Sequence, residues 1–136
     1  MEGNDENLSH LDVNSYATMI DKVIEKFPNI SVVATTLRQV RTASRNDWSA
    51  IAWSKDTGLV RSVERPNLEI LDRVGGGDSF AAGLVAGLME TGDLQKAVEL
   101  GAAHGALAMT TPGDTSMVTR CEVESLAAGG SARVKR

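Results

Sequence analysis

Apolar and polar positions along the chain predict a helix first and then a strand. An apolar stripe at helical spacing runs from Tyr16 to Phe27 and predicts an amphipathic helix over residues 15–26, which ends before Pro28. The residues in this stripe are Tyr16, Met19, Ile20, Val23, Ile24 and Phe27. The following run SVVATTL, residues 31–37, is short and β-branched, which is typical of a strand buried on both faces.

The next apolar segments predict a β-hairpin and one more strand. Residues 47–54 and 58–63 flank a short polar segment, and Gly58 supplies turn chemistry, so we expect a hairpin at the edge of a sheet. Trp48 and Trp53 are an odd number of positions apart, which places them on opposite faces of a strand. Residues 68–72, LEILD, are expected to form the last short strand.

Helical spacing returns in the C-terminal half of the chain. We expect helices over residues 79–90, 94–109 and 120–128. Asp93 is the expected N-cap of the second of these helices, and Thr119 with Glu122 forms a capping-box pattern before the third. Gly129 and Gly130 are expected to end the third helix.

These elements predict part of an α/β sheet flanked by helices, with the hairpin at its edge. The expected organisation is a disordered segment over residues 1–12, one folded unit over 13–130 and a disordered tail over 131–136.

Composition and charge exclude several classes of partner. The net charge is −4 and no lysine or arginine cluster is present, which argues against binding to nucleic acid or to an anionic membrane. No apolar run approaches a membrane span, and the acidic N-terminus is unlike a signal peptide, so we expect a cytoplasmic protein. A single cysteine and two histidines exclude an internal disulfide and a zinc cluster.

A glycine-rich stretch, DRVGGGDSFAAG at residues 72–83, joins the last predicted strand to a helix. It fails the dinucleotide fingerprint, because Phe80 stands where the third glycine is required. Consecutive glycine amides before a helix can nonetheless form a cradle for an anion. A carboxylate beside that cradle, Asp78, suits phosphoryl transfer, in which it would orient and deprotonate an attacking hydroxyl.

A purely structural interpretation of the same stretch stays open. Asp78 would then only cap the following helix, and the glycines would only permit a tight turn, because aspartate is a preferred N-cap residue.

The stretch resembles the C-terminal signature of the PfkB, or ribokinase-like, family of sugar kinases. That signature reads Asp-Thr-x-Gly-Ala-Gly-Asp, then Ser or Ala, then Phe, and this chain has Asp72-Arg73-Val74-Gly75-Gly76-Gly77-Asp78-Ser79-Phe80. Arg73 and Gly76 depart from the usual threonine and alanine. With these two departures and the segments VATTLR, NDW and TTPGD, the chain is most similar to one branch of the family. That branch phosphorylates 2-keto-3-deoxygluconate to its 6-phosphate with ATP.

The resemblance implies a role for each matching position. Asp78 would be the catalytic base, and the backbone of Gly75, Gly76 and Gly77 would be the anion hole. Asp72 would help to hold a monovalent cation, as in some members of the family. The candidates for the nucleotide site are Thr36, His104 and Gly113, although a structural role for Thr36 or His104 stays open. The implied cofactors are ATP and Mg²⁺, with K⁺ in some members.

The resemblance also implies that this sequence covers only the C-terminal part of the family's fold, with the lid and the first strands absent. We therefore expect little kinase activity from this chain alone. We expect it to form a homo-oligomer or to pair with a missing N-terminal half, because a sheet edge would be exposed. The alternative is a non-catalytic nucleotide-binding or interaction module derived from such a kinase.

Overall fold

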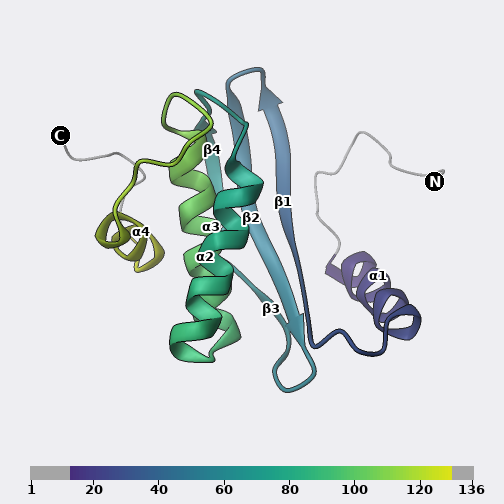
Figure 1. The fold of residues 1–136 in the computed structure, drawn as a ribbon. Coiled ribbons are helices and arrows are strands. Elements are labelled where there is room, and N and C mark those ends of the chain that lie inside the picture. Colours follow the sequence, from purple (N-terminus) through teal and green to yellow (C-terminus); the bar gives the residue numbers. More distant parts are fainter. Residues whose placement is uncertain (1–12, 130–136) are drawn as a thin grey trace.

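The computed structural model describes residues 13–129, which form four helices and a four-stranded sheet (Figure 1). The segments expected to be disordered, residues 1–12 and 131–136, and the expected helix stop at Gly130 lie outside the described residues. In chain order the elements are α1 (Val13–Lys26), β1 (Val32–Thr42), β2 (Arg45–Ser54), β3 (Gly58–Arg61), β4 (Arg65–Glu69), α2 (Gly76–Thr91), α3 (Leu94–Met109) and α4 (Arg120–Ala127).

The sheet is antiparallel throughout and is organised around β2. β1 pairs with β2 from Val32 opposite Ser54 to Thr42 opposite Arg45. On the other side of β2, β3 pairs with its C-terminal half and β4 with its N-terminal half. Ser62 bridges the gap between β3 and β4, since its hydroxyl accepts the Ala50 N–H at 2.9 Å. The expected hairpin of β2 and β3 is confirmed, but β2 is the central strand of the sheet, so of the two hairpin strands only β3 lies at an edge.

All four predicted strands have different bounds in the structure, and two of them differ most. The strand expected to end at residue 37 continues to Thr42, and only Leu37 within it is fully buried, so it is not buried on both faces. The strand expected over 68–72 is β4, which ends at Glu69. Residues 71 and 72 leave the sheet because their N–H groups donate to the Met109 carbonyl at the end of α3, at 2.9 and 3.2 Å.

Asp47 holds the irregular pairing of β2 with β4. Its carboxylate accepts the Asn67 N–H at 2.8 Å and the Arg41 Nε–H at 2.7 Å, and Asn67 has a positive φ of 56°. The hydrogen bond from Arg41, followed by the Asn67 backbone, lowers the pKa of this carboxyl group. The carboxylate therefore stays ionised and substitutes for the pairing that is lost where the register shifts between residues 46 and 48.

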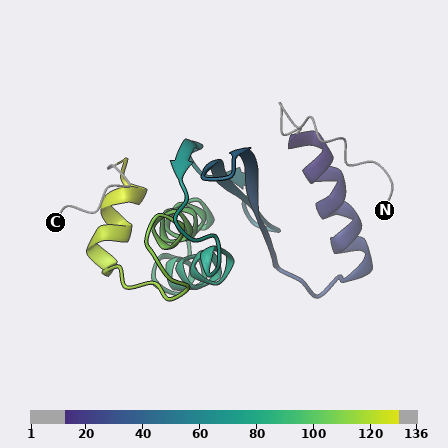
Figure 2. The ribbon, with the colours of Figure 1, turned by 90° about the horizontal axis from the view of Figure 1, so that it is seen from above.

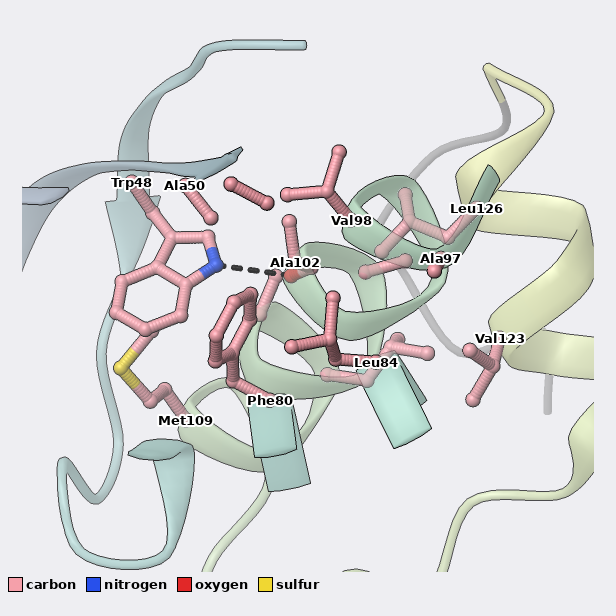
Figure 3. Close-up of a cluster of buried hydrophobic side chains, with 14 of the residues drawn as sticks. Trp48, Ala50, Phe80, Leu84, Ala97, Val98, Ala102, Met109, Val123 and Leu126 are labelled. Carbon is pink, nitrogen blue, oxygen red and sulfur yellow. Dashed lines mark hydrogen bonds between the residues drawn. The ribbon is translucent and has the colours of Figure 1, made fainter. Parts of the chain in front are cut away.

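Helices cover both faces of the sheet. Seen from above, α4, the pair α2 and α3, the sheet and α1 follow one another across the molecule (Figure 2). Trp48 is buried with α2 and α3 in the larger core, and its indole N–H donates to the Ala102 carbonyl at 2.8 Å (Figure 3). Trp53 lies in the smaller core beneath α1, around Ile20 and Leu37. The prediction that the two tryptophans face opposite sides is confirmed.

Glycines allow α2 and α3 to pack with their backbones in close contact. A methyl group added at Gly83 would lie 2.8 Å from the Leu100 carbonyl oxygen, and one added at Gly101 would lie 2.8 Å from that of Phe80. Such contacts require something to shift, so the two helices could not keep this separation with larger residues. The small residues Gly101 and Gly105 therefore let α3 pack closely against α2 and against Trp48 of the sheet.

The predicted caps of α3 and α4 are confirmed. Asp93 is the N-cap of α3 and accepts the Lys96 N–H at 3.0 Å. Thr119 and Glu122 form the expected capping box, in which the Thr119 N–H donates to the Glu122 carboxylate at 2.7 Å. Each cap contributes about 1 kcal/mol. Among the helices within residues 13–129, none is long and apolar enough to cross a bilayer.

Candidate active site

The glycine loop, residues 70–75, connects β4 to α2 and is anchored to the end of α3. The Met109 carbonyl accepts the N–H groups of Leu71 and Asp72, and the Asp72 carboxylate accepts the Val74 N–H at 2.9 Å. These bonds turn the chain so that it enters α2 at Gly76. The helix therefore begins three residues earlier than the sequence predicts, and Gly76, Gly77 and Asp78 form its first turn.

The three glycines have different surroundings. Gly75 is the N-cap with a φ of 83°, and a side chain there would collide with the backbone carbonyl of Asp114. A methyl group at Gly76 would lie 2.8 Å from the Met109 side chain. A methyl group at Gly77 would meet nothing within 4 Å. Two glycines therefore permit close packing, and the third leaves the start of the helix open.

Asp78 is exposed at this open corner. The helix cap is Gly75 and no side chain caps the helix, so the interpretation of Asp78 as the N-cap is wrong. Its carboxylate makes no hydrogen bond or ion pair recorded within the described part of the chain. The corner is thus not covered by side chains, and its carboxylate lies beside the positive end of the helix dipole.

The three nucleotide-site candidates are not gathered in one hollow. His104 lines a groove of about 300 Å³ between α2, α3 and α4. Gly113 lies in the segment of residues 110–119, which contacts Gly75 through the Asp114 carbonyl. Thr36 lies opposite Ala50 in the middle of β1, not at a strand end as expected. Val32 and Ala34 pack against the larger core, on the face of the sheet that α2 and α3 cover. Side chains alternate along a strand, so Thr36 faces the same side.

His104 joins three parts of the site. Its Nε2 is 2.8 Å from the Ser116 hydroxyl, and its ring also interacts with the Ser79 backbone at the start of α2. Burial lowers the pKa of the imidazole, and the Ser79 backbone opposes this shift. Glu90, Arg120 and Glu124 line the same groove, and the Arg120 guanidinium pairs with both carboxylates.

We expect the stability contributed by His104 to depend on pH. Because the folded state lowers its pKa, the unfolded chain binds the proton more readily, and the contribution is complete above about pH 6.5. It is lost as the pH falls below that value towards the folded pKa. Urea unfolding at pH 7.5 and 5.5 should show the wild type losing more stability on acidification than His104→Gln. An identical loss in both proteins would contradict the assignment.

A second hollow, of about 490 Å³, lies beside Asp72 and was missed by sequence reasoning. We call it the arginine hollow, and its lining includes Arg38, Val40, Asn46, Leu71, Asp72 and Arg73. The alternation of side chains along β1 could have indicated Arg38, because it places Arg38 on the same face of the sheet as Thr36. The sequence could not predict that residues 70–73 lie beside Arg38 and complete the hollow.

Asp72 is the residue expected to help with a cation. Its carboxylate lines the arginine hollow and accepts one backbone N–H. Within residues 13–129, no three acidic, histidine or cysteine side chains form a group that could hold a metal ion. These residues alone thus offer single carboxylates, Asp72 and Asp78, and not a complete protein ligand set.

The sequence model of the pfkB family carbohydrate kinases matches residues 41–121, more than half of the chain. The chain therefore belongs to this family of carbohydrate kinases. It is 28% identical over 133 residues to 2-dehydro-3-deoxygalactonokinase of Haloferax volcanii, a match that covers 81% of this chain and 42% of that protein.

Solved structures agree with this assignment. 2-Dehydro-3-deoxygluconokinase from Thermotoga maritima superposes with a TM-score of 0.80 and 35% identity, covering 90% of this chain and 36% of that one. A PfkB family carbohydrate kinase from Listeria grayi gives a TM-score of 0.76 at 24% identity, covering 90% and 36%, and supports the fold alone. The expected fold, part of a ribokinase-like domain, is confirmed. The chain spans less than half the length of each of these relatives.

Proposed function

We propose that this chain carries the phosphoryl-transfer corner of a sugar-acid kinase that uses ATP. The observation that supports this most directly is the open start of α2, where Gly77 has free space and Asp78 is exposed. Main-chain amides there can neutralise charge on the migrating phosphoryl group. Asp78 is the base that orients the acceptor hydroxyl and takes its proton as the new P–O bond forms and ADP leaves.

The proposed acceptor is the 6-hydroxyl of 2-keto-3-deoxygluconate. Two of the three relatives, those from Haloferax volcanii and Thermotoga maritima, act by their names on 2-dehydro-3-deoxy sugar acids, and the Thermotoga maritima protein is 35% identical to this chain. Mg²⁺ would accompany ATP, since it is held mainly by nucleotide phosphates together with one or two carboxylates. Asp78 and Asp72 are the carboxylates available near the glycine loop, and Asp72 is the candidate for a monovalent cation.

Calorimetric titration with ATP tests the corner. We expect Asp78→Asn to keep the wild-type affinity for ATP without Mg²⁺, because neutralising the base removes no N–H group that donates to the phosphates. Gly77→Ala should weaken ATP binding about tenfold, since its methyl group would occupy the cradle without disturbing the fold. Equal affinity for wild type and Gly77→Ala would place the phosphate elsewhere.

The alternative function is a nucleotide-binding or interaction module that does not catalyse transfer. The observation that favours it is the short span of the match, 42% and 36% of the two relatives named as sugar-acid kinases. For this chain by itself we propose ATP binding with little turnover. Rapid consumption of 2-keto-3-deoxygluconate and ATP, abolished by Asp78→Asn, would instead establish it as a complete catalyst.

We also propose that β1 pairs with another strand, from a second copy of the chain or from a separate N-terminal half. β1 has 11 residues, and its edge away from β2 pairs with no strand within residues 13–129. Unpaired edges of this length favour association. Sedimentation should therefore show a dimer or a complex at micromolar concentration. A monomer over the whole concentration range, with no partner bound, would count against this proposal.

A further inference from the structure

The arginine hollow contains two cationic side chains that the fold itself does not use. Arg38 and Arg73 both line it, and both residues are exposed. Neither guanidinium makes a hydrogen bond or an ion pair recorded for residues 13–129. By contrast, the nearby Arg41 is paired with Asp47, and Arg45 donates to the Asn67 carbonyl at 3.3 Å.

The walls of the hollow are fixed by the fold. Arg38 is held in register opposite Trp48, which is 3% exposed in the core. The opposite wall is anchored where the N–H groups of Leu71 and Asp72 donate to the Met109 carbonyl. Asn46, which is 5% exposed, contributes a polar side chain to the lining. The two arginines are thus mounted on a rigid strand and on an anchored loop.

Charge and chemistry indicate what this hollow would bind. Among residues 13–129, Asp72 is the only carboxylate that lines the hollow, so these lining residues carry a net positive charge although the whole chain carries −4. The Asp72 carboxylate already accepts the Val74 N–H. Guanidinium groups present several N–H donors in a planar fork that matches the oxygens of phosphates and carboxylates.

We propose that Arg38 and Arg73 together bind the polyphosphate chain of the nucleotide. This inference deepens the proposed function and rests on it. Arg73 precedes Gly75 by two residues, so a phosphate chain that ends at the glycine amides can extend along this wall towards β1. Arg73 stands where the family signature has threonine, which gives this chain an additional cation at the glycine loop. Arg38 and Arg73 are positioning residues, and the transfer step remains with Asp78.

Binding measurements on single variants test the proposal. We expect Arg38→Gln and Arg73→Gln each to weaken ATP binding about tenfold, and to leave the affinity for adenosine unchanged. Lys96→Gln is the matched control for net charge, because Lys96 is exposed on α3 and does not line the hollow. Thermal unfolding of all three variants should match the wild type, since each side chain is at the surface.

Titrations with tripolyphosphate and with 2-keto-3-deoxygluconate distinguish a nucleotide site from a general anion site and from a sugar site. If the wild type binds no ATP but binds tripolyphosphate in a way that needs both arginines, the hollow is an anion site and the kinase proposal fails. If the arginine variants lose affinity for 2-keto-3-deoxygluconate and keep it for ATP, the hollow holds the sugar carboxylate and the assignment to phosphate is overturned. Unchanged binding of ATP and of tripolyphosphate in both variants would also overturn it.

Discussion

Replacing Trp48 with alanine is expected to destabilise the protein by about 3–5 kcal/mol, the range typical of large aromatic residues in a packed core. The indole is 3% exposed, and its ring packs among α2, α3 and the sheet. The substitution also leaves the buried Ala102 carbonyl without its 2.8 Å donor. Urea unfolding followed by circular dichroism measures the loss directly.

Trp53→Ala provides the matched control. The same residue type lies on the same strand but on the opposite face, where it is only partly buried against the smaller core. We expect a loss of about 1–2 kcal/mol, because less apolar area returns to water. Equal losses for the two variants would show that the larger core does not depend on Trp48.

The second large effect is expected at Gly75. Alanine there must adopt a φ of 83°, which costs about 1–2 kcal/mol for a residue with a side chain. Its methyl group would also collide with the Asp114 carbonyl, so the glycine loop and the segment of residues 110–119 must separate. We expect a total loss of about 2–4 kcal/mol.

Gly77→Ala is the control within the same three glycines. Gly77 lies in the first turn of α2, and a methyl group there meets nothing within 4 Å, so stability should not fall. Urea unfolding gives the energies, and hydrogen exchange should show faster exchange in residues 71–77 and 110–119 for Gly75→Ala alone. Equal stability of the two variants would mean that the contact with Asp114 does not hold the loop.

Elements whose signals are local could be predicted from the sequence. The spacing of apolar residues predicted α1 and most of α2, and the caps at Asp93 and Thr119 predicted the start of α3 and α4. The hairpin of β2 and β3 followed from its turn chemistry, and the opposite faces of Trp48 and Trp53 followed from strand alternation. The glycine signature likewise indicated the family, because its residues are consecutive in the chain.

Boundaries set by distant contacts could not be predicted in this way. Glycine is unfavourable inside a helix, so the sequence placed the start of α2 at Ser79. The hydrogen bonds that anchor the glycine loop to the end of α3 turn the chain into the helix earlier, at Gly76. The apolar run at 68–72 resembled a strand, but its last N–H groups bond to the end of α3. Thr36 was expected at a strand end because nothing local indicates that β1 continues along β2 to Thr42.

The sequence by itself therefore determined the family signature and, with it, the chemistry that we propose: main-chain amides beside a carboxylate at the start of a helix. Only the tertiary structure decided which glycine is open, that Asp78 is exposed and does not cap the helix, and that Arg38 and Arg73 line one hollow. The physical reason is that chemical identity and periodicity are properties of neighbouring residues. Exposure and the meeting of side chains depend on how β1, the glycine loop and α3 pack together.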